Sequence, residues 1–178
     1  MNTKELQIEG VKLINNFSQE DSRGLFVKPF TKIVKSFKEL SFEINEFYYS
    51  ISQKNVIRGM HFQHPPMDHA KLIYLTSGRI TDVLLDLRKS SKTYKNHIAI
   101  DLTAHENSLF IPPGIAHGFL SNEDGTTVVY SQSSVYSQDH DDGVLWKSFG
   151  YDWRVDEPIL SDRDRSFIEF NDFNSPFD

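Results

Sequence analysis

The chain has 178 residues, a length that suits one domain with a buried core, and it contains no cysteine, which excludes a disulfide framework and thiolate chemistry. Its net charge of −6 argues against a surface that coats nucleic acid. Residues 1–10 lack the pattern of a signal peptide, and no apolar run approaches the roughly 20 residues of a membrane span. We therefore expect a cytoplasmic protein with neither a nucleic-acid nor a membrane partner.

Short strand-like runs separated by polar turns follow one another through most of the chain, a pattern typical of an all-β sandwich or barrel. They predict strands at 11–15, 25–31, 43–52, 56–62, 72–76, 79–87, 97–102, 109–112 and 126–136. Residues 18–24 read as a turn between the first two strands. Apolar residues at helical spacing predict one short helix over 32–42: Ile33, Val34, Phe37 and Leu40.

The C-terminal part of the chain has a different character. It is acidic at first, then irregular, and it carries both tryptophans, Trp146 and Trp153. Tryptophan side chains are large and mostly apolar, so we expect this tail to pack against the barrel. The sequence thus predicts a single domain over 1–178, with a core barrel at about 11–136 and a docked C-terminal tail at 137–178.

Two predicted strands, 56–62 and 72–76, place three side chains that could bind a ligand or transfer a proton near one another: Arg58, His61 and Lys71. A guanidinium can grip an anion, an imidazole can move a proton at neutral pH, and an ammonium supplies a second positive charge. A lysine within an apolar strand is costly to bury unless an anionic group meets it. That group is either a ligand or a structural partner such as Asp82 or Asp86. The stretch therefore predicts an active-site wall, and the alternative is a set of paired core residues.

The glycines and prolines around this stretch resemble the two sequence motifs of cupin barrels. Gly59 and Gly78 fall at the outer glycines of the first motif, and Pro112, Gly114 and His117 match the Pro-x-Gly-x-x-His core of the second. This resemblance implies a mainly β fold, a cupin-type double-stranded β-helix or jelly-roll barrel with one or two short helices.

The metal ligands of the cupin motif are missing from this chain. Its two histidine positions are occupied by Pro65 and Met67, and its glutamate position by Lys71. An ammonium group repels a divalent cation instead of coordinating it. We therefore expect no bound catalytic metal, although the chain has histidines that could form a different cluster: His61, His64, His69 and His117.

A more specific resemblance is carried by segments that occur in a fixed order: DSRGLF (21–26), VIRGMHFQHPP (56–66), AKLIYLTSG (70–78), DVLLDLRKSS (82–91), IPPGIAHGF (111–119), VVYSQSSVY (128–136) and LSDRD (160–164). Almost end to end, they resemble the dTDP-4-dehydrorhamnose 3,5-epimerase family, also called the RmlC-like epimerases. The resemblance implies a cofactor-independent isomerase that acts on a nucleotide-diphosphate 4-keto-6-deoxy sugar. It also implies a place in deoxysugar and surface-polysaccharide biosynthesis, such as that of the O-antigen of lipopolysaccharide.

The resemblance assigns catalytic roles. It implies that His61 is the base, that Asp164 of the tail orients it, and that Tyr130 is the acid on the opposite face of the sugar. Lys71 falls where the family stabilises the enolate. Inversion beside a ketone needs a base, an acid and a group that stabilises the negative oxygen. Each residue alone also has a structural interpretation. His61 could be a core histidine, Tyr130 a tyrosine of an amphipathic strand, Asp164 a solvated carboxylate of the tail, and Lys71 a lysine paired with a carboxylate.

A second set of residues is implied to bind the substrate. Arg58 and Arg23 would hold the diphosphate, because guanidinium suits phosphate oxygens through bidentate hydrogen bonds. In the family the arginine at the Arg23 position arrives from the neighbouring subunit, so the resemblance implies a homodimer with exchanged N-terminal strands. The other members of the set pack the nucleotide or line the pocket: Phe26, Tyr136, His117 and Phe119.

Three positions depart from the family pattern. Glu46 and Tyr48 stand where the family usually has amide side chains, and Lys28 stands where it commonly has a glutamate that contacts the pyrimidine. A carboxylate accepts a hydrogen bond from an exocyclic amine, which cytosine has and thymine lacks. We therefore hypothesise that Lys28 and Glu46 alter the nucleotide site, with a CDP-linked sugar as the candidate.

Two other functions stay open at the level of the sequence. A nucleotide-sugar 3,4-ketoisomerase would use similar proton transfers on a related barrel, but Lys71 and the tail Asp164 fit an epimerase better. A catalytically silent nucleotide-sugar binding protein would not need a base, an orienting carboxylate and an acid together. Inversion at carbon 3 alone and inversion at carbons 3 and 5 are not distinguished by any residue of the sequence.

Overall fold

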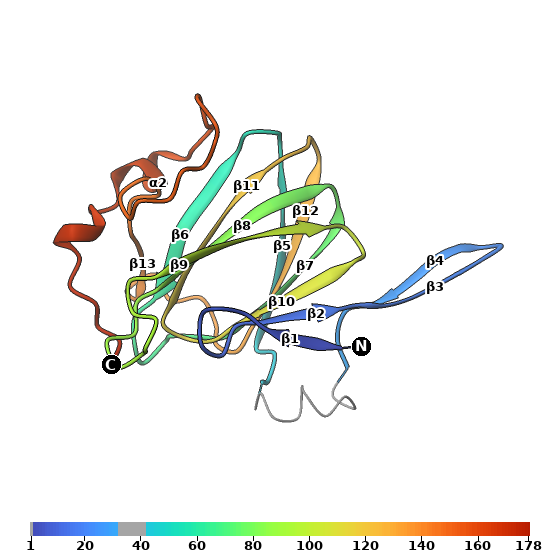
Figure 1. Cartoon of the computed structure of the whole chain (residues 1–178), viewed down its shortest axis with the longest axis horizontal. Coiled ribbons are helices and arrows are strands. Elements are labelled where there is room, and N and C mark those ends of the chain that lie inside the picture. The colour runs from blue at the N-terminus through green and yellow to red at the C-terminus, as the bar shows by residue number, and fades with distance from the viewer. Residues whose placement is uncertain (1, 32–41) are drawn as a thin grey trace.

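The structure, a computed structural model, describes residues 2–31 and 42–178. Two antiparallel sheets face one another and form the body of the molecule (Figure 1). The six-stranded sheet has the order β1 (Thr3–Glu5), β2 (Lys12–Asn15), β10 (Asn107–Ile111), β7 (Lys71–Ser77), β12 (Thr126–Gln132) and β5 (Glu46–Ser52). The five-stranded sheet has the order β13 (Asp141–Gly143), β6 (Ile57–Gln63), β11 (Ile115–Ser121), β8 (Arg79–Asp86) and β9 (His97–Thr103). The mainly β jelly-roll fold expected from the sequence is confirmed.

Within residues 2–31 and 42–178, a hairpin and two short helices lie outside these sheets. The hairpin consists of β3 (Phe17–Asp21) and β4 (Gly24–Lys28), and the tail contains α2 (Asp162–Ser166) and the 3-10 helix η1 (Phe170–Asp172). Of the helices that the structure describes, none is long and apolar enough to cross a membrane. The helix predicted over 32–42 falls, apart from its last residue, outside the described residues.

Strands β3 and β11 differ from the sequence-based expectation for physical reasons, and the short strands β1 and β13 were not predicted at all. The turn predicted at 18–24 is wrong, because residues 17–21 form β3 and only Ser22 and Arg23 turn between the two strands of the hairpin. Every residue of β3 is exposed, so no alternation of apolar and polar positions marks it as a strand. Every residue of β11 is buried, which likewise removes the alternation, and it was not predicted as a continuous strand.

Apolar side chains of both sheets fill the space between them. Ile73 of β7 and Val128 of β12 belong to one buried cluster with Leu84 of β8. Side chains two residues apart on a strand point to the same face. Lys71 and Tyr130, each two residues from one of these core positions, are therefore directed inward between the sheets.

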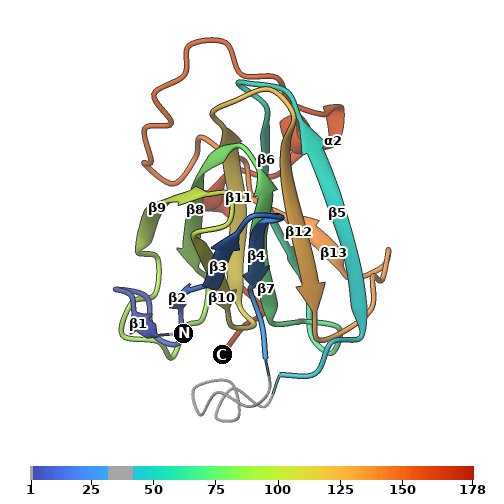
Figure 2. The same ribbon diagram turned by 90° about the vertical axis from the view of Figure 1, so that its right-hand side faces the viewer.

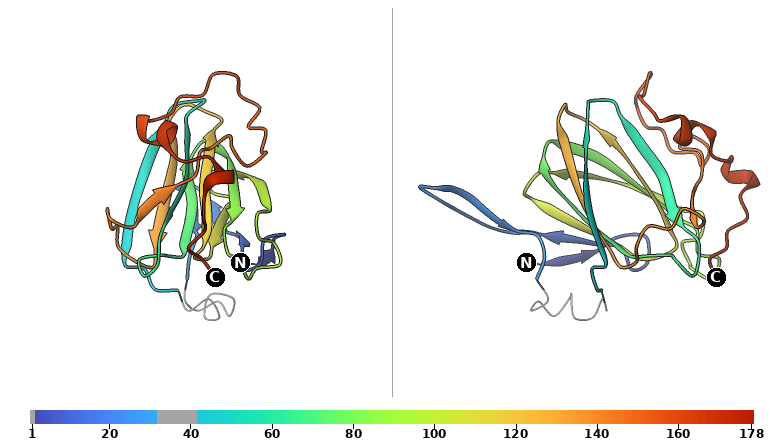
Figure 3. Two further views of the ribbon diagram at one scale, coloured as in Figure 1. Left: turned by 90° about the vertical axis from the view of Figure 1, so that its left-hand side faces the viewer. Right: turned by 180° about the vertical axis from the view of Figure 1, so that it is seen from behind.

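The tail packs on the outer face of the five-stranded sheet. Trp153 and Phe177 join a buried cluster with Met60 of β6 and Leu85 of β8. The indole N–H of Trp153 donates a hydrogen bond to the Trp146 carbonyl oxygen at 2.7 Å. Figure 3 shows the tail on the outside of the barrel, away from the projecting hairpin. Each large apolar side chain buried in this way contributes about 1.5–3 kcal/mol, so the tail holds α2 firmly beside β6.

In the part of the chain that the structure describes, the β3–β4 hairpin and strand β5 both expose apolar side chains to solvent. The β3–β4 hairpin projects from the body (Figure 1) and exposes three large side chains: Phe17, Leu25 and Phe26. Figure 2 shows β5 at the free edge of its sheet, beside β12. Its outward side chains are exposed by 60% or more: Phe47, Tyr49 and Ile51. Contiguous exposed apolar surface of this kind marks protein contacts.

Gly59 lies where β6 approaches β11 too closely for a side chain. Its φ is +136°, and an added Cβ would overlap the Gly118 Cα and lie 2.9 Å from the His117 carbonyl oxygen. We expect Gly59→Ala to lower the free energy of unfolding by roughly 3–5 kcal/mol, because it combines backbone strain with overpacking. Denaturant unfolding measures this loss.

Gly125→Ala is the matched control for that substitution. Gly125 also has a positive φ, +71°, but the space around its Cβ position is open. Strain alone should lower its free energy of unfolding by about 1 kcal/mol. Similar losses in the two variants would contradict the overpacking argument.

Candidate active site

A pocket of about 460 Å³ lies between the two sheets, and strands of both contribute to its wall. It is lined by Glu46, Tyr48, Ser50, Arg58, His61, Phe62, Gln63, His69, Lys71, His117, Phe119, Tyr130, Gln132, Tyr136, Asp141 and Arg163. The sequence-predicted site residues in its lining are Glu46, Arg58, His61, Lys71, His117, Phe119, Tyr130 and Tyr136. Residues that lie far apart in the chain thus meet in one cavity.

Three predicted binding residues lie away from this pocket within the chain. Arg23, Phe26 and Lys28 belong to the projecting hairpin. The Arg23 side chain is 88% exposed, and its guanidinium pairs with the Asp21 carboxylate at 2.6 Å. A single chain therefore does not bring Arg23 and Arg58 together.

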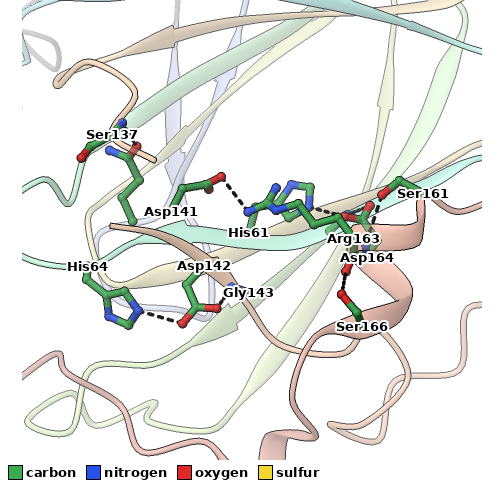
Figure 4. Close-up of polar contacts among 12 residues, drawn as sticks. His61, His64, Ser137, Asp141, Asp142, Gly143, Ser161, Arg163, Asp164 and Ser166 are labelled. Atoms are coloured by element: carbon green, nitrogen blue, oxygen red, sulfur yellow. Dashed lines mark hydrogen bonds and ion pairs between the residues drawn. The ribbon is translucent and has the colours of Figure 1, made fainter. Parts of the chain in front are cut away.

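His61 enters the pocket from β6, and Asp164 holds it from behind (Figure 4). The imidazole Nε2 lies 2.8 Å from Asp164 Oδ1. The second carboxylate oxygen, Oδ2, accepts a hydrogen bond from the Gly59 N–H at 3.2 Å. Ser161 caps α2, and its Oγ accepts a hydrogen bond from the Asp164 N–H at 3.1 Å. Because a carboxylate only accepts, the His61 proton lies on Nε2 and the lone pair on Nδ1.

The charges of this pair follow from its surroundings. Burial lowers the pKa of His61, and the hydrogen bond and charge of Asp164 oppose this only in part. Burial alone would raise the pKa of Asp164, but the hydrogen bonds from His61, Gly59 and Ser161 outweigh it and lower that pKa. At neutral pH the pair is a neutral imidazole beside a carboxylate, the state in which Nδ1 can accept a proton.

Lys71 enters the same pocket from β7, in the opposite sheet. Its buried ammonium donates a hydrogen bond to the His61 carbonyl oxygen at 3.3 Å. Burial lowers the pKa of Lys71 from 10.5 to about 8, against the opposing charges of Asp141 and Asp82. The side chain is thus mostly charged at pH 7. An ammonium has three donors, so it can also bind a negative oxygen in the pocket.

The structural partners considered for Lys71 are engaged elsewhere. Asp82 lies 2.7 Å from His117 Nε2. Asp86 accepts hydrogen bonds from the Arg88 guanidinium at 2.9 Å. The cost of burying the Lys71 ammonium is therefore not offset by a direct ion pair with either carboxylate, which favours a ligand as its partner.

Tyr130 comes from β12, so it and His61 approach the pocket from opposite sheets. Burial raises the pKa of Tyr130, which keeps the phenol protonated at neutral pH. Its ring stacks on Tyr48 of β5, with centroids 4.7 Å apart and an interplanar angle of 15°. A protonated phenol on one wall and a neutral imidazole on the other can together give a proton to one face of a ligand and take one from the other face.

The histidines do not gather around a common centre. They bind separate partners at 2.7–3.2 Å: His61 with Asp164, His64 with Asp142, His69 with Gln63, and His117 with Asp82. Within residues 2–31 and 42–178, no group of three or more histidine, cysteine, aspartate or glutamate side chains is arranged to hold a metal ion. The alternative histidine cluster is therefore not present in the described part of the chain.

Several pocket residues were not assigned from the sequence. Gln63 lies two residues after His61, and Gln132 two residues after Tyr130, so strand periodicity would have placed them on the same faces. Asp141 of β13 and Arg163 of α2 form an ion pair of 2.7 Å in the pocket wall (Figure 4). No local pattern in the sequence brings these two elements together.

Comparison with known proteins gives one consistent result. The sequence matches the family model described as dTDP-4-dehydrorhamnose 3,5-epimerase over residues 5–172. It is 35% identical over 178 residues to the dTDP-4-dehydrorhamnose 3,5-epimerase of Shigella flexneri, covering 97% of each chain. The RmlC epimerase of Mycobacterium tuberculosis has a TM-score of 0.92 to this fold at 31% identity, covering 97% of this chain and 90% of that one.

A further solved structure comes with a bound sugar nucleotide. It is the dTDP-6-deoxy-D-glucose-3,5-epimerase RmlC of Legionella pneumophila in complex with dTDP-4-keto-L-rhamnose. Its TM-score is 0.89 at 27% identity, and the match covers 97% of this chain and 94% of that one. The fold therefore defines the class as an RmlC-like jelly-roll barrel. The chain belongs to the dTDP-4-dehydrorhamnose 3,5-epimerase family and is an enzyme of the isomerase class, as its sequence segments indicated.

Proposed function

We propose that this protein inverts stereocentres beside the ketone of a nucleotide-diphosphate 4-keto-6-deoxy sugar, at carbon 3 or at carbons 3 and 5. The reaction would serve deoxysugar biosynthesis for a surface polysaccharide of the O-antigen type. The observation that carries the proposal is a neutral imidazole, His61, and a protonated phenol, Tyr130, on opposite walls of one pocket. The family relationship supports it, since a relative was solved with a dTDP-4-keto sugar bound.

The proton transfers balance without a redox step. His61 Nδ1 takes the proton from the carbon next to the ketone, and the electrons of that C–H bond form an enolate. The Lys71 ammonium stabilises the enolate oxygen. Tyr130 then gives its phenolic proton to the other face of the carbon, which inverts it. Proton exchange with water returns the imidazolium and the phenolate to their starting states, so this chemistry requires no cofactor.

Arg58 is suited to hold the diphosphate at the mouth of this pocket. Its Nε donates to Ser52 Oγ at 3.1 Å, and its Nη2 donates to the Ile51 carbonyl oxygen at 3.3 Å. These contacts with β5 leave further guanidinium N–H groups for phosphate oxygens. Tyr136, whose side chain is 57% exposed at the pocket, offers a ring on which a nucleotide base can stack.

A homodimer with exchanged hairpins is the second part of the proposal. The hairpin carries Arg23, Phe26 and Lys28 away from its own pocket, and it exposes apolar side chains. The β5 edge beside the pocket exposes a complementary apolar surface. Docking the hairpin of one protomer on the β5 edge of the other would cover both surfaces and bring Arg23 to the partner's diphosphate site.

Mixing two inactive variants tests this exchange. Arg23→Ala removes the arginine given to the partner, whereas His61→Ala removes the base of the protein's own pocket. In a heterodimer of the two, one pocket has an intact His61 and receives an intact Arg23. We expect co-expressed variants to recover about a quarter of the wild-type sites, because about half of the dimers are mixed and one of their two sites is complete. Activity no higher than that of the separate variants would contradict the exchange.

The nucleotide is proposed to differ from thymidine diphosphate. Glu46 lines the pocket, and Lys28 lies on the hairpin that would reach the partner's nucleotide. A carboxylate at this end can accept the exocyclic amine of cytosine, so a CDP-linked sugar is the candidate. Thermal-shift titration with CDP and dTDP compares the two nucleotides. We expect greater stabilisation by CDP, and stabilisation by dTDP alone would remove this part of the proposal.

The proposed activity is tested in heavy water with dTDP- and CDP-4-keto-6-deoxyglucose in separate reactions. NMR follows deuterium entry at carbons 3 and 5 and the configuration of the product. We expect exchange accompanied by inversion at carbon 3, with or without carbon 5. Migration of the carbonyl group would instead identify a 3,4-ketoisomerase, and no exchange with either nucleotide would favour a binding protein.

A further inference from the structure

Tyr48 and Tyr130 form a directly opposed pair on neighbouring strands. The register of β5 and β12 sets Tyr48 opposite Tyr130, and both side chains line the pocket. Their rings stack with centroids 4.7 Å apart and an interplanar angle of 15°. A cross-strand aromatic contact of this kind is favourable and restricts the rotation of both rings.

Further contacts fix this pair in place. The Tyr48 hydroxyl oxygen accepts a hydrogen bond from Gln132 Nε2 at 2.6 Å. The ring of His117 meets the Tyr130 ring at 64°, with centroids 6.2 Å apart. His117 is itself held by the buried Asp82 at 2.7 Å. Tyr130 is therefore held by a parallel ring and an edge-on ring, each of which is anchored by its own hydrogen bond.

The stereochemical result of the proposed reaction depends on where the second proton comes from. Return of the proton by His61 forms the C–H bond on the original face, which gives isotope exchange without inversion. Donation by Tyr130 forms the bond on the opposite face, which inverts the carbon. In both cases the electron pair of the enolate makes the new bond. The phenol must be well placed to compete, because a displacement of about 1 Å costs about 100-fold in rate.

We propose that Tyr48 is a positioning residue that holds Tyr130 against the inverting face of the sugar, and that it thereby sets the ratio of inversion to simple exchange. This inference rests on the proposed function. Tyr48 acts through the face of its ring, since its hydroxyl oxygen is bound by Gln132. Proton removal is independent of it, because His61 belongs to the other sheet and is oriented by Asp164.

The test measures the initial rates of deuterium entry and of inversion at carbon 3 separately, in heavy water, with the 4-keto-6-deoxyglucose nucleotide that the wild-type protein turns over. In Tyr48→Ala we expect the ratio of exchange to inversion to rise at least about 10-fold, with the exchange rate within about threefold of wild type. Tyr48→Leu, which fills the space without an aromatic face, should behave in the same way. Tyr48→Phe keeps the stacked ring and should leave the ratio within about twofold.

Two reference variants accompany these substitutions. Tyr130→Phe removes the donor itself and defines the ratio for exchange without inversion. Tyr74→Ala removes a tyrosine of β7 that does not line the pocket. In the register of the two strands, Tyr74 stands opposite Val129 of β12. It should keep the wild-type ratio, since it changes the adjoining strand without touching the Tyr48 ring.

The outcomes separate this inference from the function on which it rests. An unchanged ratio in both Tyr48→Ala and Tyr48→Leu would overturn the positioning role while leaving the epimerase intact. Loss of inversion in Tyr48→Phe as complete as in Tyr130→Phe would also overturn it, because the hydroxyl and not the ring would then matter. No exchange by the wild-type protein would overturn the proposed function, and this inference with it.

Discussion

Replacing His61 with alanine is expected to lower kcat/KM by about 1,000-fold or more and to abolish deuterium entry into the sugar. General-base catalysis by a positioned side chain contributes about 10²–10⁴-fold, and His61 is held for this role by Asp164 at 2.8 Å. Nucleotide binding should persist, because the role proposed for the imidazole is proton removal and not binding of the diphosphate. Steady-state kinetics, together with isothermal titration of the nucleotide diphosphate, measure the two effects separately.

His64→Ala is the matched control for this substitution. His64 also forms a histidine–carboxylate pair at 2.8 Å, with Asp142, and lies three residues further along the chain. Figure 4 draws both pairs. His64 does not line the pocket, so its loss should change kcat/KM by no more than about twofold. Comparable losses in both variants would mean that His61 acts through the fold and is not the base.

Replacing Lys71 with methionine is expected to lower kcat by about 100- to 1,000-fold and at the same time to stabilise the fold. The activity falls because the enolate oxygen loses its positive partner. The stability rises because the wild-type protein buries an ammonium whose pKa drops from 10.5 to about 8, which corresponds to roughly 3 kcal/mol of unfavourable burial. Methionine fills a similar volume without charge, although the His61 carbonyl oxygen loses its donor. We therefore expect a gain of about 1–2 kcal/mol in the free energy of unfolding.

The pH dependence of the activity and of the free energy of unfolding tests the two expectations for Lys71. Activity should fall as pH rises through about 8, where Lys71 loses its charge, and as pH falls below the lowered pKa of His61, where the imidazole becomes protonated. The lysine keeps its proton up to about pH 10.5 in the unfolded chain but only up to about pH 8 in the folded protein. The burial of Lys71 therefore destabilises the folded protein fully below pH 8, and this loss of stability is relieved as the pH rises above 8. Lys71→Met should lack this rise in stability. A Lys71→Met protein that is less stable and equally active would refute both expectations.

Most strands could be predicted from the sequence as short apolar or β-branched runs between polar turns, and this holds even for β8, which is buried along most of its length. Two such runs located the wall that carries Arg58, His61 and Lys71. The argument failed for β3, whose residues are all exposed and form no apolar run, and for β11, where a histidine and a glycine interrupt the run. Local patterning thus detects strands by their apolar runs and misses those that lack a continuous one.

Contacts between distant segments were beyond local patterning. Asp164 is separated from His61 by 103 residues, and only the resemblance to a family singled it out from its polar surroundings. The stacking of Tyr48 on Tyr130 depends on the register between β5 and β12, which neither strand specifies by itself. The ion pair of Asp141 with Arg163 likewise requires the tail to be docked first.

The docked tail also ties the proposed catalytic pair to the integrity of the distal part of the chain. Asp164 lies 103 residues after His61, and the tail that carries it packs on the outer face of the five-stranded sheet through Trp153 and Phe177. A protein cut by a protease between the barrel and α2 would expose this apolar surface and lose the carboxylate beside His61 together. Proteolytic damage to the tail is therefore expected to remove activity and stability at the same time.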